Sequence, residues 1–583
     1  MSVNEQRFRW RNKQLRDHAD VIDGNLAPTK VLKHITYLNV FLKQWMTGNI
    51  WIFEDRIVYV GTEMPPNLDG TEIIEGDGDY AVPGYIEPHA HPFQLYNPQS
   101  LAEYAAWTGT TTVINDNLMW LFLTDKKKAF SLLEECMKLP VSMFWWGRFD
   151  FQTTLREEKQ EKLEEQLPEW FTHDAVVQGG ELTAWPELLY GKDDQILHWM
   201  QEVRKARKRV EGHLPGASEN TLTKMKLLGL DGDHESMTAD DVVKRVELGY
   251  ETGVRHSSIR PDLPQIMEGL VEKDFQAFDR LMYTTDGSTP GFYKDGVIDN
   301  CIDIALKAGI PEIEAYLMAT IYPARHFGLD ERLGALAPGH IAHVNLLDSK
   351  DRPSPHSVLA KGEWVKKREK DVHTKVKLDW ASAEIVPLSL DWSLGIEELQ
   401  FSMPVGMDMV NDVIMKPYAV ESNTSVEQLP ETTNEAFLTL LDREGTWKVN
   451  TLLRGFTSSL GALSSSYSTT GDIILLGKSK EDMVLAFERM EEIGGGIVLV
   501  HDKKVVFEMP LAYGGMMSRE PFEELMEQES VLKEKLCEYG YCFGDPVYTL
   551  FFLSSTHLPY VRITPRGLMD VKKKEVLFPA IMR

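Results

Sequence analysis

Between residues 83 and about 333 the sequence alternates short β-rich runs with helix-like segments, and this alternation most constrains the fold. Residues 101–107 are helix-like and lead into the β-rich run Thr110-Thr111-Thr112-Val113-Ile114-Asn115-Asp116. Further strands or strand ends are predicted at residues 176–181, 209–213, 254–258 and 281–286. Repetition of this kind predicts a parallel sheet covered by helices, either a (β/α) barrel or a doubly wound sheet.

The segments on both sides of the alternating region have β texture. Residues 49–61 contain two β-rich runs around the polar pair Glu54-Asp55, which predicts a hairpin. Residues 334–347 and 358–365 return to β texture. We expect them to pair with the hairpin, in one small β domain built from both flanks of the alternating region. Residues 1–35 are polar and mostly helix-like.

Beyond about residue 370 the sequence predicts a separate C-terminal region. The charge-rich stretch 366–377 suits a boundary. Residues 471–500 follow a β-α-β pattern, with the helix at 480–493. The run Gly494-Gly495-Gly496 precedes a strand, and no Gly-Lys-Ser/Thr follows it, so we interpret it as a turn and not as a phosphate-binding loop.

Composition and charge limit the classes of partner. The 583 residues predict two to four domains, and the net charge is −27. Binding nucleic-acid phosphates or an anionic membrane needs an excess of Lys and Arg, so we expect neither partner, while a homo-oligomer stays open. The four cysteines form no Cys-x-x-Cys pair, residues 1–7 lack an apolar signal-peptide core, and no run of eighteen apolar residues occurs. These features favour a cytoplasmic protein.

The strongest chemical signal is His89-Ala90-His91, which follows a short apolar strand and Pro83-Gly84. In an extended segment both imidazoles point the same way and form half of a divalent-metal site. Alone, the pair could equally be loop histidines. The later candidates appear in order at predicted strand ends, and a β/α barrel builds its active site at those ends. The candidate metal ligands are His89, His91, Glu181, His213, His234 and Asp286.

Four imidazoles and two carboxylates match the nitrogen and oxygen ligands of zinc, manganese or iron. If two ions lie close together, a carboxylate such as Glu181 would bridge them. A hydroxide between the ions would then be the nucleophile, because a metal lowers the pKa of bound water towards neutrality.

These residues resemble the metal motifs of the amidohydrolase superfamily. Val82-Pro83-Gly84-x-Ile86-x-x-His89-x-His91 matches its opening motif, and residues 323–329 and 334–339 match the end of its barrel. Within the superfamily the chain is most similar to bacterial adenine deaminases, over roughly residues 40–365 and 450–583. The motifs that carry this likeness are Gly180-Glu181, Gly212-His213-x-Pro215-Gly216, Asp233-His234-Glu235, Thr284-Thr285-Asp286, Gly471-Asp472-Ile473-Ile474, Gly495-Gly496-Ile497-Val498, Met517-Ser518-x-Glu520-Pro521 and Thr564-x-Arg566-Gly567-Leu568-x-Asp570-Val571.

The sequence departs from the family pattern near the expected substrate. Pro92-Phe93-Gln94-Leu95 replaces Ile-Glu-Ser-Ser after the paired histidines, and Asp116-Asn117-Leu118-Met119 replaces Asp-Pro-His-Glu. Asp286-Gly287 replaces a pair of aspartates, and Arg255-His256-Ser257-Ser258 replaces Arg-Glu-Gly-Ser. Metal-dependent hydrolysis is therefore better supported than adenine as the substrate.

The resemblance implies a (β/α)8 TIM-like barrel, flanked by a small β-sandwich domain built from both sides of the barrel, with a C-terminal α+β domain. The implied boundaries are residues 1–83 for the N-terminal segment and first part of the β domain, 84–333 for the barrel, 334–367 for the second part of the β domain, and 368–583 for the C-terminal domain.

The implied activity is hydrolytic deamination of adenine to hypoxanthine and ammonia, with two divalent ions per chain, manganese or iron in preference to zinc. Asp286 would accept the proton of the attacking water, and Glu235 would shuttle a proton to the leaving amine. Asp116, Arg255 and His256 are predicted to line the pocket. The alternatives are an amidohydrolase acting on another aminated heterocycle or a cyclic amide, and a degenerate barrel without catalysis.

Overall fold

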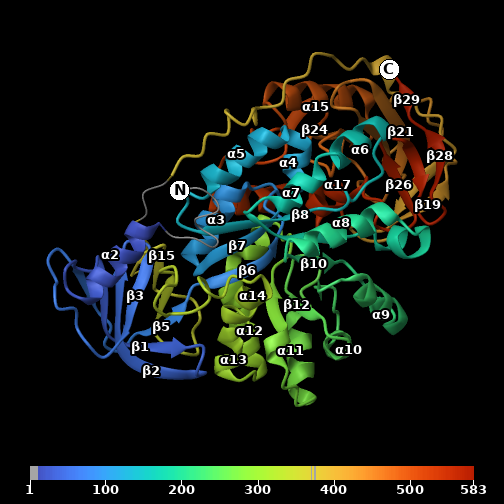
Figure 1. The fold of residues 1–583 in the computed structure, drawn as a ribbon. Coiled ribbons are helices and arrows are strands. Elements are labelled where there is room, and N and C mark those ends of the chain that lie inside the picture. Colours follow the sequence, from blue (N-terminus) through green and yellow to red (C-terminus); the bar gives the residue numbers. More distant parts are fainter. Residues whose placement is uncertain (1–10, 369, 373–375) are drawn as a thin grey trace.

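A computed structural model describes residues 11–368, 370–372 and 376–583 and confirms the predicted fold class, a (β/α)8 barrel with a flanking β domain and a C-terminal α+β domain (Figure 1). Residues 1–7, which carry the expectation about a signal peptide, lie outside the described residues. None of the helices in the described ranges is long and apolar enough to cross a membrane.

The strands of the parallel sheet are neighbours in the order of the sequence, so the sheet is a barrel and not a doubly wound sheet. A doubly wound sheet would reverse its strand order at some point. A bridge between Ala90 and Asp286 brings the first and last strands together. The strands are β6 (Tyr85–Ala90), β7 (Thr110–Asp116), β8 (Ser142–Gly147), β9 (Val176–Leu182), β10 (Arg209–Gly212), β11 (Gly232–Asp233), β12 (Glu251–Arg255) and β13 (Leu281–Thr284).

Helices alternate with these strands and cover the outside of the barrel (Figure 1). They are α3 (Pro98–Trp107), α4 (Leu118–Leu123), α5 (Lys126–Cys136), α6 (Glu157–Glu164), α7 (Leu167–Thr172), α8 (Asp194–Lys205), α9 (Glu219–Leu228), α10 (Ala239–Glu247), α11 (Leu263–Glu272), α12 (Ile298–Ala308), α13 (Glu312–Leu317) and α14 (Ile321–His326). Helix α10 is capped at its start by Thr238, whose Oγ1 accepts a hydrogen bond from the Asp241 backbone N–H at 3.2 Å.

The flanking domain is one sheet that joins both sides of the barrel in the sequence. Strand β5 (Tyr80–Pro83) pairs antiparallel with β14 (Val344–Leu347), with Ala81 opposite Leu346. The other strands are β1 (Lys30–Asn39), β2 (Gln44–Phe53), β3 (Arg56–Gly61), β4 (Glu72–Glu75), β15 (Ser357–Ala360), β16 (Glu363–Lys367) and β17 (Lys370–Asp371). The hairpin predicted at residues 49–61 is confirmed by β2 and β3.

Helix α2 (Asn12–Ile22) covers only part of the segment expected to be helical. The prediction is wrong from Lys30 onward, where β1 begins. Val31, Leu32 and Ile35 are fully buried in this strand. Burial of these side chains and pairing with β2 therefore place this part of the segment in a strand, although its sequence is helix-like.

The C-terminal domain contains a second mixed sheet and a small three-stranded sheet. The larger sheet consists of β18 (Val405–Met409), β19 (Met415–Ala419), β20 (Glu435–Leu441), β21 (Trp447–Arg454), β22 (Ala462–Ser465), β23 (Ile473–Gly477), β24 (Gly496–His501), β25 (Lys504–Pro510) and β29 (Ile581–Met582). The smaller sheet and the remaining helices are β26 (Val561–Thr564), β27 (Gly567–Asp570), β28 (Glu575–Pro579), α15 (Lys480–Glu492), α16 (Phe522–Glu538) and α17 (Pro546–Phe552).

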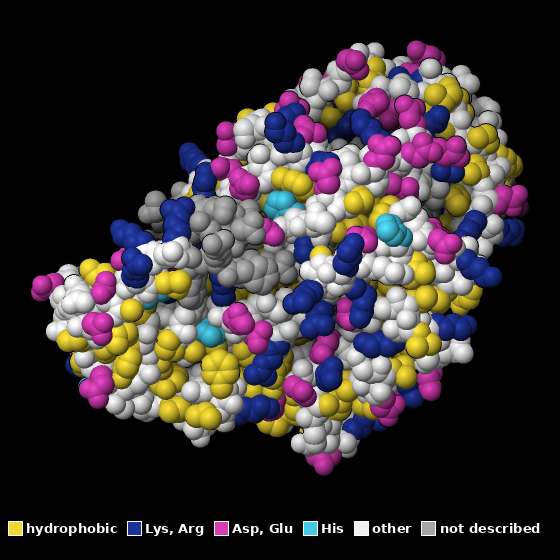
Figure 2. All heavy atoms as spheres, viewed as in Figure 1, with side chains coloured by type: hydrophobic (Ala, Val, Ile, Leu, Met, Phe, Trp, Pro, Cys, Tyr) yellow, Lys and Arg dark blue, Asp and Glu magenta, His cyan; other side chains and the backbone are white. Residues whose placement is uncertain are grey.

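The predicted β-α-β unit is confirmed as β23, α15 and β24. Gly494 and Gly495 lie in the turn between α15 and β24, and Gly496 is the first residue of β24. Only glycine suits Gly496, because its φ is +143° and a Cβ there would lie 2.1 Å from the Met509 carbonyl oxygen. On the face shown in Figure 2, acidic and basic side chains are interspersed, and several acidic ones lie over the C-terminal domain.

A buried carboxylate holds the first and last barrel strands together. Glu87, in β6, is 2% exposed. It accepts hydrogen bonds from the backbone N–H of His89 (2.9 Å), the Thr284 hydroxyl (2.8 Å), and the backbone N–H (2.9 Å) and hydroxyl (2.6 Å) of Thr285. Burial raises the pKa of Glu87 to about 7, although these hydrogen bonds act in the opposite direction.

Replacing Glu87 by Ala should destabilise the barrel, because it leaves several buried donors without a partner at about 1–3 kcal/mol each. We expect the thermal midpoint of barrel unfolding, measured by scanning calorimetry, to fall by about 5–10 °C. Glu272→Ala, at the exposed end of α11, is the matched control and should shift the midpoint little. Equal midpoints for the two variants would contradict this role of Glu87.

Candidate metal centre

The six predicted ligands lie at one end of the barrel, at the carboxyl ends of its strands. His89 and Glu181 lie within β6 and β9, and His91 follows β6 by one residue. His213 and His234 directly follow β10 and β11, and Asp286 lies two residues beyond β13. Parallel strands in a closed barrel bring these ends together, so residues far apart in the sequence share one site.

Glu181 lies between two groups of histidines. Its Oε1 atom is 2.7 Å from Nδ1 of His213 and 3.6 Å from Nε2 of His234. Its Oε2 atom is 3.9 Å from Nε2 of His91. The two oxygens of one carboxylate thus face different imidazoles, which is the arrangement that a bridging ligand needs.

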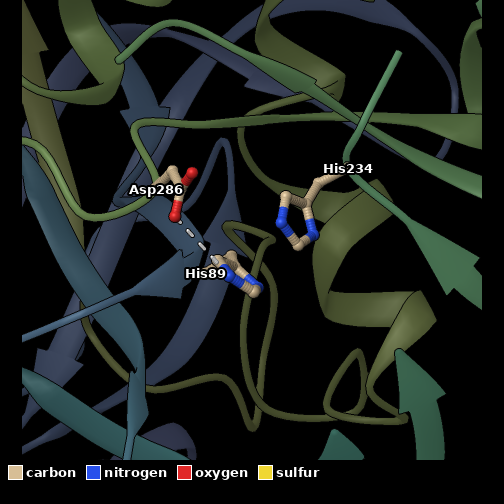
Figure 3. Close-up of side chains that lie close together, drawn as sticks. All are labelled: His89, His234 and Asp286. Atoms are coloured by element: carbon tan, nitrogen blue, oxygen red, sulfur yellow. Dashed lines mark ion pairs between the residues drawn. The ribbon is translucent and has the colours of Figure 1, made fainter. Parts of the chain in front are cut away.

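Asp286 completes the cluster from the opposite side. Its Oδ1 atom is 2.9 Å from Nε2 of His91 and 3.8 Å from Nε2 of His89. Figure 3 shows Asp286 and the rings of His89 and His234 converging, with the Asp286–His89 pair dashed. Three groups of side chains each offer ligand atoms that lie within 4.8 Å of one another. The first is His89, His234 and Asp286; the second is His89, His91 and Glu181; the third is Glu181, His213 and His234.

The chemistry of these side chains fits a divalent metal. Among the described residues, neither ring nitrogen of His89 has a hydrogen-bond partner, and neither does Nε2 of His234. Both residues are at least 98% buried. Buried polar atoms without a partner are rare in folded proteins, and a metal ion would satisfy these nitrogens.

Buried acidic residues orient two of the imidazoles from behind. Asp116 Oδ2 is 2.7 Å from Nδ1 of His91, and Glu211 Oε1 is 3.1 Å from Nδ1 of His234. Each contact fixes its ring and leaves the other nitrogen, Nε2, facing the site. Asp116 was predicted to line the pocket, but its place behind His91 makes it a support for a ligand.

Arg148 is a site residue that the sequence interpretation missed. It directly follows β8 and is fully buried. Its Nε donates to Asp116 Oδ1 at 2.9 Å, and its Nη2 donates to Glu181 Oε2 at 3.0 Å. Glu211, in β10, was missed as well. Both occupy strand ends, so the position that identified the histidines could also have identified these two residues.

Arg255 links the two carboxylates predicted to move protons. Its Nη1 donates to Glu235 Oε1 and to Asp286 Oδ2, each at 2.6 Å. Burial raises the pKa of Asp286, but Arg255 and His91 outweigh burial and hold that pKa well below its usual range. Burial likewise raises the pKa of Glu235, while Arg255 and the neighbouring histidines bring it to about 2. Both groups are therefore carboxylates at neutral pH.

A cavity of about 190 Å³ adjoins these side chains. A water molecule occupies about 30 Å³ in the liquid, so the cavity has room for a small molecule. Glu235 and Arg255 line the cavity together with Asp286. His256, also predicted for the pocket, is not among the described residues that line it, and its ring packs 5.0 Å from that of Phe292.

The departures from the family pattern have structural counterparts. Phe93 stacks on Phe551 with ring centroids 5.9 Å apart, and the Gln94 side chain accepts a hydrogen bond from the Tyr467 hydroxyl. A Cβ atom at Gly287 would lie 2.8 Å from Cδ2 of His91 and 3.1 Å from Nε2 of Gln94. A second aspartate at position 287 would therefore require these neighbours to shift.

Comparisons with known proteins agree with this geometry. The model of the amidohydrolase family matches residues 80–367, and that of the adenine deaminase C-terminal domain matches residues 411–575. A putative adenine deaminase of Oceanobacillus iheyensis is 54% identical, over 98% of this chain and 99% of its own. Those of Halalkalibacterium halodurans and Bacillus subtilis are 52% and 51% identical, over 99% and 100% of this chain and 100% of their own. A cluster of histidines and carboxylates at the barrel mouth, together with relatives that match from end to end, means that the chain belongs to the adenine deaminase family of the amidohydrolases.

Proposed function

We propose that this protein is a metal-dependent hydrolytic deaminase that converts adenine and water to hypoxanthine and ammonia. The observation that carries the proposal is the set of buried imidazole nitrogens that lack partners among the described residues and lie with carboxylates beside one cavity. Full-length relatives named putative adenine deaminases support the choice of substrate. We place the reaction in the cytoplasm, with a small molecule as partner and neither nucleic acid nor membrane.

The metal part of the proposal is two divalent ions, manganese or iron. Glu181 would contribute to both sites, because its two oxygens face His213 and His91 respectively. Both ring nitrogens of His89 and Nε2 of His234 lack partners among the described residues, so these two side chains would bind ions as well. When bound, such ions supply a water molecule of lowered pKa as the nucleophile.

The carboxylates would handle the protons of the reaction. Asp286 accepts one proton of the attacking water as the C6–O bond forms and the C6=N1 double bond opens towards N1, and it passes this proton to N1. Glu235 takes up the second proton of the water and passes it to the amino nitrogen, so that the C6–N bond breaks, the C6=O bond forms and ammonia leaves. Arg255 donates to both carboxylates at 2.6 Å and holds them in place beside the cavity.

A second candidate substrate class is favoured by the wall of the cavity. Gly287 stands where the family pattern has a second aspartate, and Gln94 occupies the space beside it. Another aminated heterocycle or a cyclic amide would use the same ions and the same Asp286. A panel of such compounds separates this alternative from adenine.

Asp286→Asn should lower kcat for adenine by at least about 100-fold, because an amide cannot accept the proton of the attacking water. The measurement is ammonia release by protein loaded with manganese or iron. Asp303→Asn, on α12 beside Lys307, is the matched control and should keep wild-type activity. If metal-loaded wild-type protein turns over no aminopurine, the deaminase proposal fails, and bound metal would then direct attention to the second substrate class.

Asp116→Asn and Glu211→Gln should each weaken metal binding by about 10- to 100-fold, because His91 and His234 lose the partners that orient them. The measurement is metal content by elemental analysis after dialysis against graded chelator. Glu268→Gln, on the exposed face of α11, serves as the control. Wild-type metal retention in both variants would argue against this orienting role.

A further inference from the structure

The C-terminal domain forms part of the wall of the cavity at the candidate metal centre. The barrel supplies the ligands and their neighbours, but it does not form the whole wall. The residues that complete the wall are Val413, Tyr548, Phe551, Phe552, His557 and Leu558. A molecule in this cavity therefore lies between side chains of the barrel and side chains of the C-terminal domain.

Hydrogen bonds fix this domain against the mouth of the barrel. The Tyr548 hydroxyl donates to the carbonyl of Gly287, which directly follows Asp286. The backbone N–H of Ser518 donates to the carbonyl of Leu95 at 2.6 Å, beside a bridge between Leu95 and Met517. These contacts fix the C-terminal part of the wall relative to the segments that carry His91 and Asp286.

The loop after α17 is tied to the barrel as well. Thr153 Oγ1 donates to the carbonyl of Ser554 at 2.5 Å, and the backbone N–H of Thr556 donates to the carbonyl of Gln152 at 2.8 Å. The loop then places the ring of His557 5.7 Å from that of His213, centroid to centroid. His557 is therefore a polar group of the C-terminal domain beside a candidate ligand.

Two neighbouring phenylalanines of α17 have different surroundings. Phe551 is 1% exposed and packs against Phe93 and Tyr467 in the domain interface. Phe552 is only partly buried, stacks on Tyr548 at 5.3 Å and lies 5.6 Å from the ring of His557. Both residues line the cavity, but Phe551 is also packed into the domain interface, whereas Phe552 is the more exposed of the two.

A larger cavity of about 670 Å³ lies next to the inner one. Gln152, His213, Pro215 and His557 line both cavities. These residues therefore stand at the boundary between the outer space and the candidate centre. Among the described C-terminal residues that line the inner cavity, His557 is the one that also lines the outer cavity.

We propose that the C-terminal domain supplies the substrate-recognition wall of this enzyme, with Phe552 packing on the flat face of the heterocycle and His557 hydrogen-bonding to its edge. This inference rests on the proposed function and assigns the substrate class as a flat, nitrogen-containing heterocycle. Such a ring offers a π face to an aromatic side chain, and its edge nitrogens match an imidazole, which can donate or accept.

The test compares Phe552→Ala, Phe552→Leu and His557→Ala with wild-type protein, all loaded with manganese. Loss of base stacking should raise KM for adenine about 10-fold in Phe552→Ala. Loss of one hydrogen bond should raise it about 5-fold in His557→Ala. In each case kcat and metal content should stay near wild type, because the wall binds substrate and reaction intermediates alike. Inhibition by hypoxanthine should weaken by the same factors.

Phe552→Leu separates recognition from packing. Leucine keeps the apolar bulk of the wall but has no π face, so a recognition role predicts a raised KM and a packing role predicts wild-type KM. His501→Ala is the matched control, since His501 lies in β24 of the same domain and lines neither cavity. It should leave KM, kcat and metal content unchanged.

The measurements distinguish failure of this inference from failure of the proposed deaminase function. Wild-type turnover with unchanged KM in Phe552→Ala and His557→Ala would overturn this inference alone. Loss of metal and of kcat at constant KM would also overturn it, because the wall would then be structural. If wild-type protein does not deaminate adenine, calorimetric titration with adenine still decides: weaker binding by the variants supports the wall, and absence of binding to wild type overturns both proposals.

Discussion

The contact between the first and last strands of the barrel is the constraint on which the candidate centre depends. Glu87 in β6 accepts hydrogen bonds from Thr284 and Thr285, and Ala90 bridges Asp286. Residues at opposite ends of the barrel sequence are thereby brought into contact. Without this closure His91 and Asp286 would not lie 2.9 Å apart, and the cluster would be open on one side.

Charge balance decides how so many acidic groups can be buried together. A buried ion is costly unless another charge or a hydrogen bond compensates it. Arg148 contacts Asp116 and Glu181 behind the imidazoles, and Arg255 contacts Glu235 and Asp286 beside the cavity. The two arginines therefore hold the carboxylates ionised and in place. The other oxygens of Glu181 and Asp286 are directed towards His213 and His91 respectively.

Several residues that depart from the family pattern contact the C-terminal domain. Phe93 and Gln94 follow the paired histidines, and both contact the C-terminal domain, through Phe551 and Tyr467. The carbonyl of Gly287 accepts a hydrogen bond from Tyr548. The segments next to the candidate ligands therefore contact the domain that forms part of the cavity wall.

The sequence by itself determined the alternation of strands and helices and the candidate ligands, and its family resemblance implied the barrel. Alternation of strands and helices is a local pattern, and the carboxyl ends of parallel strands meet at one face, so His89, His91, Glu181, His213, His234 and Asp286 could be grouped without coordinates. Only the tertiary structure decided that Asp116 supports His91, that Arg148 and Glu211 belong to the site, that His256 lies outside the cavity, and that His557 lines it. The physical reason is that a local sequence pattern places a residue at a strand end and so on one face of the barrel. Its contacts depend on side chains that are distant in the sequence and on how a second domain packs over that face.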